Sequence, residues 1–126
     1  MNKVLWLDDM RDPFSKDFNT WYPTGCEVYW VKTFEEFTSW ITTNGLPYHI
    51  CFDHDLYDEH VEDFYDSIRT GKNLKYDEYE EKCGYHCALW LIEYCNKNSK
   101  PLPKYSIHTF NSKGRINLRK YLEKYK

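Results

Sequence analysis

Three short polar clusters along the chain combine carboxylates with imidazole, hydroxyl and amide groups. They are Asp8-Asp9, Asp53-His54-Asp55, and His108-Thr109 with the nearby Asn111. Four carboxylates gathered in one crevice cannot all be ionised unless a cation compensates their charge. A divalent ion such as Mg²⁺ or Mn²⁺, held by Asp8, Asp9 and Asp53, would do so, and Arg11 together with a histidine is the alternative without a metal.

The two histidines of these clusters indicate acid–base chemistry on phosphorus. Hydrolysis of a cyclic phosphate needs one group that activates water and another that protonates the leaving oxygen, and histidine suits both roles near neutral pH. His54 and His108 follow different apolar runs, so they could flank one phosphorus atom from two sides. Asp53 and Asp55 would then orient a histidine or hold the metal.

Groups that could bind phosphate oxygens lie close to the same clusters. Arg11 follows the first cluster, Thr109 and Asn111 belong to the last one, and Lys113 and Arg115 follow it. The stretch around Gly114 is at the start of a predicted helix, where backbone N–H groups and side chains bind phosphate. We therefore expect Arg11, Thr109, Asn111 and Arg115 to bind the substrate.

The periodicity of apolar residues predicts the elements that position these clusters. Short apolar or β-rich runs predict strands at 3–7, 27–31, 49–52 and 105–109, and helical spacing predicts helices over 33–44, 84–95 and 116–125. Residues 10–26 are predicted to form a loop with one short helix at most. The alternation favours a single α/β domain, 1–126, in which a parallel sheet of about four strands has helices on both faces as a small three-layer unit. Ligands of such sheets bind at the carboxyl ends of the strands, where all three clusters fall.

Residues 57–82 have a different character, and we interpret them as an insertion after the third strand. They hold nine acids against four bases, alternate the acids with tyrosine and phenylalanine, and have no clean period, so we expect them to be partly helical. Tyr57, Phe64, Tyr65, Tyr76 and Tyr79 could form a lid, bind a protein partner or stack a base. General nucleic-acid binding by this segment is disfavoured, because its acids repel phosphates.

Composition and charge set the broad class of protein. Aromatic residues make up 19% of the 126 residues, which excludes a disordered chain, and the length fits one domain. The sequence shows neither a membrane-spanning apolar run nor a secretory pattern, so we expect a cytoplasmic protein without membrane contact. The net charge of −3 conceals a basic region, because residues 97–126 carry nine Lys or Arg against Glu123 alone. Such a region could help attract an anion.

Four stretches of the sequence together resemble a known family. They are Leu7-Asp8-Asp9-Met10-Arg11-Asp12-Pro13, Phe52-Asp53-His54-Asp55-Leu56, Gly84-Tyr85 at a helix start, and the run from His108 to Asn117. In this order they are similar to the cyclic-phosphate processing receiver-domain family of bacteria and phages. The resemblance implies a location in the host cytoplasm if a phage encodes the protein. The resemblance implies a receiver-like (flavodoxin-like) fold and action on a cyclic phosphate end or nucleotide. It also implies one site that unites the three clusters with Arg11 and Arg115.

These observations leave three functions open. The first is a phosphodiesterase that hydrolyses a cyclic phosphate, on a 2′,3′-cyclic RNA end or a small cyclic nucleotide, with His54 and His108 as acid and base. The second is a signalling receiver that is phosphorylated on Asp53, with Mg²⁺ held by Asp8 and Asp9. The third is a non-catalytic module that binds a nucleotide or a protein partner, in signalling or against host defence, with residues 57–82 as the protein-binding surface.

Overall fold

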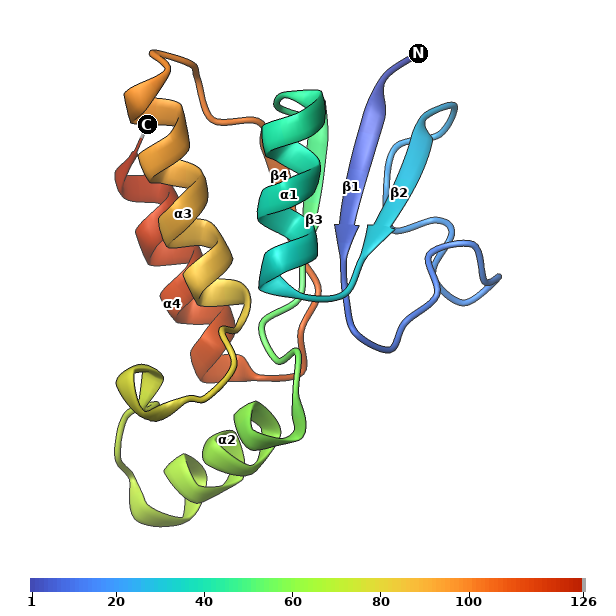
Figure 1. The fold of residues 1–126 in the computed structure, drawn as a ribbon. Helices are drawn as coiled ribbons and strands as arrows, with labels where there is room; N and C mark the ends of the chain where they lie inside the picture. Colours follow the sequence, from blue (N-terminus) through green and yellow to red (C-terminus); the bar gives the residue numbers. More distant parts are fainter. Residues whose placement is uncertain (126) are drawn as a thin grey trace.

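The computed structural model describes residues 1–125, and its centre is a parallel four-stranded sheet (Figure 1). The strands are β1 Lys3–Leu7, β2 Glu27–Val31, β3 His49–Phe52 and β4 Lys104–Ile107, and they lie in the order β2-β1-β3-β4. The helices are α1 Phe34–Asn44, α2 Asp58–Thr70, α3 Gly84–Lys97 and α4 Ser112–Lys124, with a short 3-10 helix, η1, at Tyr76–Glu78. The first three predicted strands are confirmed at their bounds, and the fourth spans 104–107 instead of the predicted 105–109.

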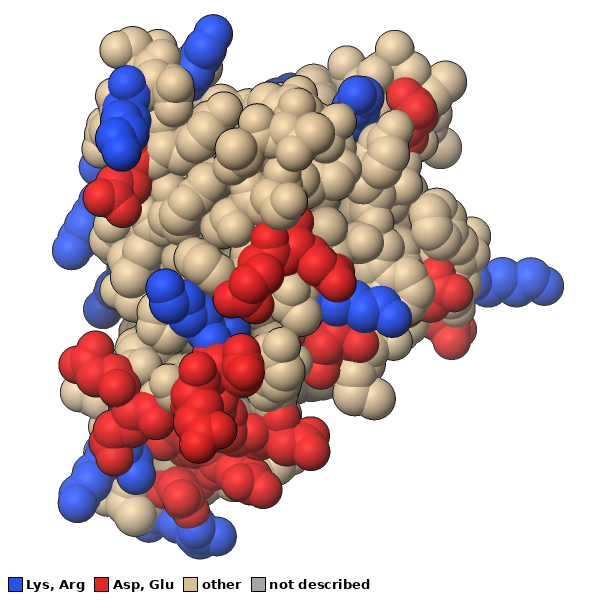
Figure 2. Space-filling model, viewed as in Figure 1, with Lys and Arg blue, Asp and Glu red and all other residues tan. Residues whose placement is uncertain are grey.

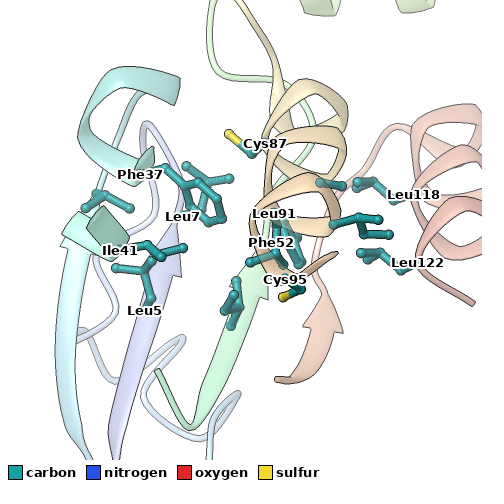
Figure 3. Packing of buried hydrophobic residues seen from close by; sticks show 14 of the residues in the cluster. Leu5, Leu7, Phe37, Ile41, Phe52, Cys87, Leu91, Cys95, Leu118 and Leu122 are labelled. Carbon is teal, nitrogen blue, oxygen red and sulfur yellow. The ribbon is translucent and has the colours of Figure 1, made fainter. Parts of the chain in front are cut away.

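The two faces of the sheet are covered in different ways. One face carries side chains such as Leu7 and Phe52 and packs against α1, α3 and α4 in one apolar core that includes Leu91 (Figure 3). The other face carries Trp6 and is covered by loop residues such as Tyr22. The parallel α/β sheet is confirmed, but a loop lies on the face where the sequence predicted helices. The reason is that the connection from β1 to β2 forms a series of turns instead of a helix.

Two helix starts show how side chains fix the edge of the sheet where the strands end. Helix α1 begins where the sequence predicts it, because Thr33 Oγ1 accepts a hydrogen bond from the Glu36 N–H at 3.1 Å. Helix α4 begins earlier than predicted, because the Asn111 side chain accepts from the Gly114 N–H at 2.7 Å and caps the helix. Gly114 is therefore part of the helix, although the predicted helix begins only at residue 116. A Cβ at this position would lie 2.4 Å from Cγ of His54, so the glycine permits close packing.

Residues 57–82 form α2 and η1 and lie beyond the carboxyl ends of the strands, below the sheet in Figure 1. The partial helix predicted here is confirmed. Lys113 of α4 holds the segment in place, because its ammonium group donates to the carbonyl oxygens of Ser67 at 2.9 Å and Lys72 at 2.8 Å. Neither α2 nor any other helix within residues 1–125 is long and apolar enough to cross a membrane.

Candidate functional site

The carboxyl ends of the strands border a crevice of about 360 Å³ beside α2. Its walls combine carboxylates, an arginine, a hydroxyl, an amide and several apolar side chains. The lining residues are Asp8, Asp9, Met10, Arg11, Asp53, Asp55, Tyr57, Asp58, Val61, Phe64, Tyr65, Thr109, Phe110 and Asn111. A larger cavity of about 840 Å³ runs beside β4, but Glu123 is the sole carboxylate among its lining residues. The crevice is therefore where residues of all three sequence clusters meet.

Asp8 is held by hydrogen bonds on both of its carboxylate oxygens. Oδ1 accepts from the backbone N–H groups of Met10 and Arg11, both at 2.9 Å, and Oδ2 accepts from Arg11 Nη1 and His108 Nε2, both at 3.0 Å. Burial alone would raise the pKa of Asp8, but the hydrogen bonds from His108, the backbone and the Arg11 side chain outweigh burial and lower the pKa below its ordinary value. Asp8 is therefore a fixed negative charge in the crevice.

Asp53 and Asp9 lie beside Asp8 and respond to its charge. Burial and then the charge of Asp8 raise the pKa of Asp53 to about 9, although Arg11 opposes this with Nη1 at 3.9 Å from Asp53 Oδ1. The same two causes raise the pKa of Asp9. Asp53 is consequently a neutral carboxylic acid at neutral pH unless a further cation enters the crevice.

The side chains of Asp8, Asp9 and Asp53 also fit a divalent cation. One oxygen from each lies within 4.8 Å of the others, and oxygen donors are the ligands that Mg²⁺ and Mn²⁺ prefer. Burial and then the negative charge of Asp8 raise the pKa of Asp53, and a divalent ion would offset both by favouring the ionised carboxylate. Arg11 supplies one positive charge beside the same carboxylates. The residues are therefore compatible with both charge-balancing solutions that the sequence left open.

His54 lies behind the wall of the crevice. Its side chain is completely buried, with Nδ1 at 2.6 Å from Asp55 Oδ1 and Nε2 at 2.8 Å from the Tyr76 hydroxyl. With a hydrogen on Nδ1, His54 donates to Asp55, while the Tyr76 hydroxyl donates to Nε2 and accepts from Asn117 Nδ2 at 2.8 Å. Asn111 Nδ2 donates to the same Asp55 oxygen at 2.9 Å. His54 thus orients Asp55, and Asp55 lines the crevice.

His108 lies beside Asp8 on the face of the sheet that the loop covers. Its ring stacks on Trp6 with 4.3 Å between the ring centroids, and its Nε2 donates to Asp8. Among residues 1–125, its Nδ1 is the one buried side-chain polar atom without a hydrogen-bond partner. The structure therefore does not bring His54 and His108 to one open point. Each instead stands behind a carboxylate of the crevice.

The four residues expected to bind substrate separate into two groups. Arg11, Thr109 and Asn111 line the crevice. Arg115 lies outside it, where Nη2 donates to the carbonyl oxygen of Thr109 at 2.7 Å and Nη1 to that of Ile107 at 3.3 Å. It lines a second cavity of about 360 Å³ together with Arg11. Backbone carbonyls thus occupy N–H groups of Arg115 that we expected to bind phosphate.

Two residues that the sequence did not place at the site, Trp6 and Tyr76, support it in the structure. Trp6 forms the surface on which His108 stacks, but in the sequence it is one apolar residue of a strand. Tyr76 completes the hydrogen bonds of His54 and stacks on Tyr85 with 4.4 Å between the centroids. The tyrosine-rich composition of residues 57–82 was the available signal for Tyr76, although composition alone does not indicate which tyrosine turns inward.

Comparison with known proteins supports the resemblance seen in the motifs. A family model described as the cyclic-phosphate processing receiver domain matches residues 3–124. No curated protein and no solved structure matches the chain significantly. The matched range contains every strand and helix described above and all residues of the crevice. The chain therefore belongs to the cyclic-phosphate processing receiver-domain family.

Proposed function

We propose that the protein hydrolyses a cyclic phosphodiester in this crevice. The observation that carries the proposal is that two carboxylates of the crevice are each backed by a histidine, Asp55 by His54 and Asp8 by His108, close to the Arg11 guanidinium. Membership of a family described as processing cyclic phosphates supports it. Catalysis then rests on carboxylates of the crevice, of which His54 and His108 hold two in place, instead of on two histidines in direct contact with phosphorus as the sequence suggested.

Each group has a task in this hydrolysis. Asp55 takes a proton from the attacking water, and His54 positions Asp55 through their 2.6 Å contact. Asp53, whose pKa of about 9 keeps it neutral, donates a proton to the leaving ester oxygen. Arg11 binds the phosphate oxygens. A bond from water oxygen to phosphorus forms as the ring P–O bond breaks. Asp55 then releases its proton to solvent and Asp53 takes one up, which returns both residues to their starting states.

A divalent ion is compatible with the same crevice. Mg²⁺ or Mn²⁺ held by Asp8, Asp9 and Asp53 would supply positive charge beside the phosphate. Asp53 would then be an ionised ligand and no longer a proton donor. His108 has the same task with or without the ion, because it holds Asp8 in place through Nε2. The dependence of the rate on added metal distinguishes these two versions of the proposal.

A hydrolysis assay tests the proposal. The panel holds 2′,3′-cyclic nucleotides, 3′,5′-cyclic nucleotides and RNA that ends in a 2′,3′-cyclic phosphate, each with and without Mn²⁺. Asp55→Asn should lower kcat by about 100-fold or more, the usual contribution of acid–base catalysis. Asp77→Asn, at an exposed aspartate of η1 outside the crevice, is the matched control. If the wild type leaves the whole panel intact under both conditions, the hydrolase proposal is wrong.

The position of Asp53 also supports a second candidate function, that of a signalling receiver that is phosphorylated on this residue. Asp53 follows β3 and lies beside Asp8 and Asp9, which would hold the Mg²⁺ that phosphorylation requires. Labelling by acetyl phosphate that disappears in Asp53→Asn would support this candidate. The hydrolase proposal gives Asp53 no covalent phosphate and predicts no label. Tight calorimetric binding of a nucleotide that stays intact would instead identify a non-catalytic binding module.

A further inference from the structure

Helix α2 turns its polar side toward the protein. The buried residues of this helix are His60, Asp63 and Ser67. His60 Nε2 donates to the carbonyl oxygen of Glu81 at 2.7 Å, and Asp63 Oδ2 accepts from the Tyr79 hydroxyl at 2.6 Å. Hydrogen bonds, and not the burial of an apolar face, therefore attach α2 to the rest of the chain.

The apolar side of α2 faces the crevice and the solvent. Val61, Phe64, Tyr65 and Ile68 recur at the spacing of one helical stripe, and Tyr65 and Ile68 are 60% and 57% exposed. The first three line the crevice, whereas Ile68 is not among its lining residues. A surface helix of a globular protein normally buries its apolar stripe against the core. The reversed orientation of α2 thus presents aromatic side chains to the space beside the carboxylates.

Two further exposed apolar side chains border the same crevice. Met10 follows β1 and Phe110 follows β4, and they are 81% and 87% exposed. Exposed apolar side chains that gather in one place mark ligand or partner sites. A crevice with carboxylates, an arginine and aromatic walls suits a ligand that joins a polar reacting group to a flat apolar body.

The charge around the crevice disfavours a long anion. Helix α2 carries five acids, Asp58, Glu59, Glu62, Asp63 and Asp66, against the single base Arg69. Figure 2 shows acidic side chains gathered over this end of the molecule. A nucleic-acid strand that continued past the crevice would bring further phosphates against these carboxylates. The volume of about 360 Å³ is near the lower limit of small-molecule sites, roughly 300–1,000 Å³, and so suits a compact ligand.

We propose that the crevice binds a cyclic mononucleotide whose base stacks on Phe64 and Tyr65 of α2. This inference rests on the proposed hydrolysis and names its substrate class, with the phosphate beside Arg11 and the carboxylates. Stacking on an aromatic side chain tolerates every base, because each base has a π-face. The aromatic wall therefore selects for the presence of a base and only weakly for its identity. Phe64 and Tyr65 are specificity-determining residues that bind substrate away from the reacting bond.

A comparison of three substrates tests the inference. They are a 2′,3′-cyclic mononucleotide, the base-free analogue ribose 2′,3′-cyclic phosphate, and an RNA oligonucleotide with the same cyclic end. The mononucleotide should exceed the base-free analogue in kcat/KM by about 10-fold or more, the contribution of one stacked base. It should also exceed the RNA, whose additional phosphates meet the acids of α2.

Substitutions in α2 test which residues stack on the base. Phe64→Ala and Tyr65→Ala should each raise KM for the mononucleotide by about 10-fold and reduce its advantage over the base-free analogue. Ile68→Ala is the matched control, because Ile68 belongs to the same exposed stripe but does not line the crevice. If an alanine variant fails to fold, as judged by circular dichroism, the corresponding leucine variant keeps the apolar volume and should still raise KM.

The possible failures of this inference and of the hydrolase proposal can be told apart. Equal kcat/KM for the base-free and base-bearing compounds would overturn base stacking, and efficient cleavage of the RNA would overturn the mononucleotide assignment. Both results would leave hydrolysis itself established. A rise in KM for Ile68→Ala as large as that for Tyr65→Ala would also contradict the inference. The loss of binding would then not depend on contact with the crevice, because Ile68 does not line it. If the wild type cleaves neither these three compounds nor a 3′,5′-cyclic mononucleotide, with or without Mn²⁺, both proposals are wrong.

Discussion

Replacement of Gly114 by alanine tests whether close packing on His54 supports the site. In an ordinary helix interior, alanine is more favourable than glycine by about 1 kcal/mol. At Gly114 the added Cβ would lie 2.4 Å from Cγ and 2.5 Å from Cδ2 of the His54 ring. Carbon atoms pack at about 3.5–4.0 Å, so either the ring or the helix must move by about 1 Å.

The expected loss of stability follows from how firmly the His54 ring is held. Its contacts with Asp55 at 2.6 Å and Tyr76 at 2.8 Å oppose any movement. Overpacking of this kind costs about 1–3 kcal/mol, and the loss of one hydrogen bond adds about 1 kcal/mol. After the helix gain of about 1 kcal/mol is subtracted, the free energy of unfolding of Gly114→Ala should fall by about 1–3 kcal/mol.

Urea unfolding followed by circular dichroism measures this loss. Ser112→Ala, at an exposed position in the same helical turn, should change the free energy of unfolding by less than about 0.5 kcal/mol and is the control. The turnover number of Gly114→Ala should also fall, because Asp55 shifts with His54. An unchanged or increased stability of Gly114→Ala would refute the packing argument.

Three further predictions concern the hydrogen-bond network and the charges of the crevice. Tyr76→Phe removes the hydroxyl that joins His54 to Asn117, so urea unfolding should show a loss of about 1–3 kcal/mol, and no loss would contradict the network. Asp53 keeps its proton in the folded state up to a pKa of about 9, while the unfolded chain loses it near the ordinary value of 3.8, so stability should fall as the pH rises through that range. Asp53→Asn should flatten this fall, and identical profiles of urea midpoint against pH for the two proteins would contradict the raised pKa. Mn²⁺ at about 100 times its Kd should stabilise the wild type by about 2.7 kcal/mol and Asp9→Asn by less, and equal Tm shifts would show that the ion binds elsewhere.

The strands and most helices could be predicted because their signals are local. The runs that form β1, β2 and β3 are apolar or β-branched and end at charged or polar residues, and Thr33 with Glu36 marks the start of α1. The covering of the second face could not be predicted in the same way. Side chains such as Phe18 and Tyr22 reach it from turns that have no period, so nothing in their spacing indicates which face they cover.

The meeting of the three clusters could also be predicted, because parallel strands end at the same edge of a sheet. How deeply each of these side chains is buried could not be predicted. His54 and Asp55 are neighbours in the sequence, yet His54 is completely buried and Asp55 lines the crevice. His54 is buried because it packs against Gly114, which is far away in the sequence. The orientation of α2 could not be predicted from the sequence either. Its buried side is polar, which is the reverse of the rule by which amphipathic helices are placed.

Hydrolysis of a 2′,3′-cyclic mononucleotide by the wild type and by Asp55→Asn, with and without Mn²⁺, tests most directly whether a carboxylate backed by a histidine performs the chemistry. The wild type should cleave the ring phosphate, and Asp77→Asn should match it. Asp55→Asn should fold normally and lose about 100-fold or more in kcat. An inactive wild type, or an Asp55→Asn variant as active as the wild type, would contradict the mechanism.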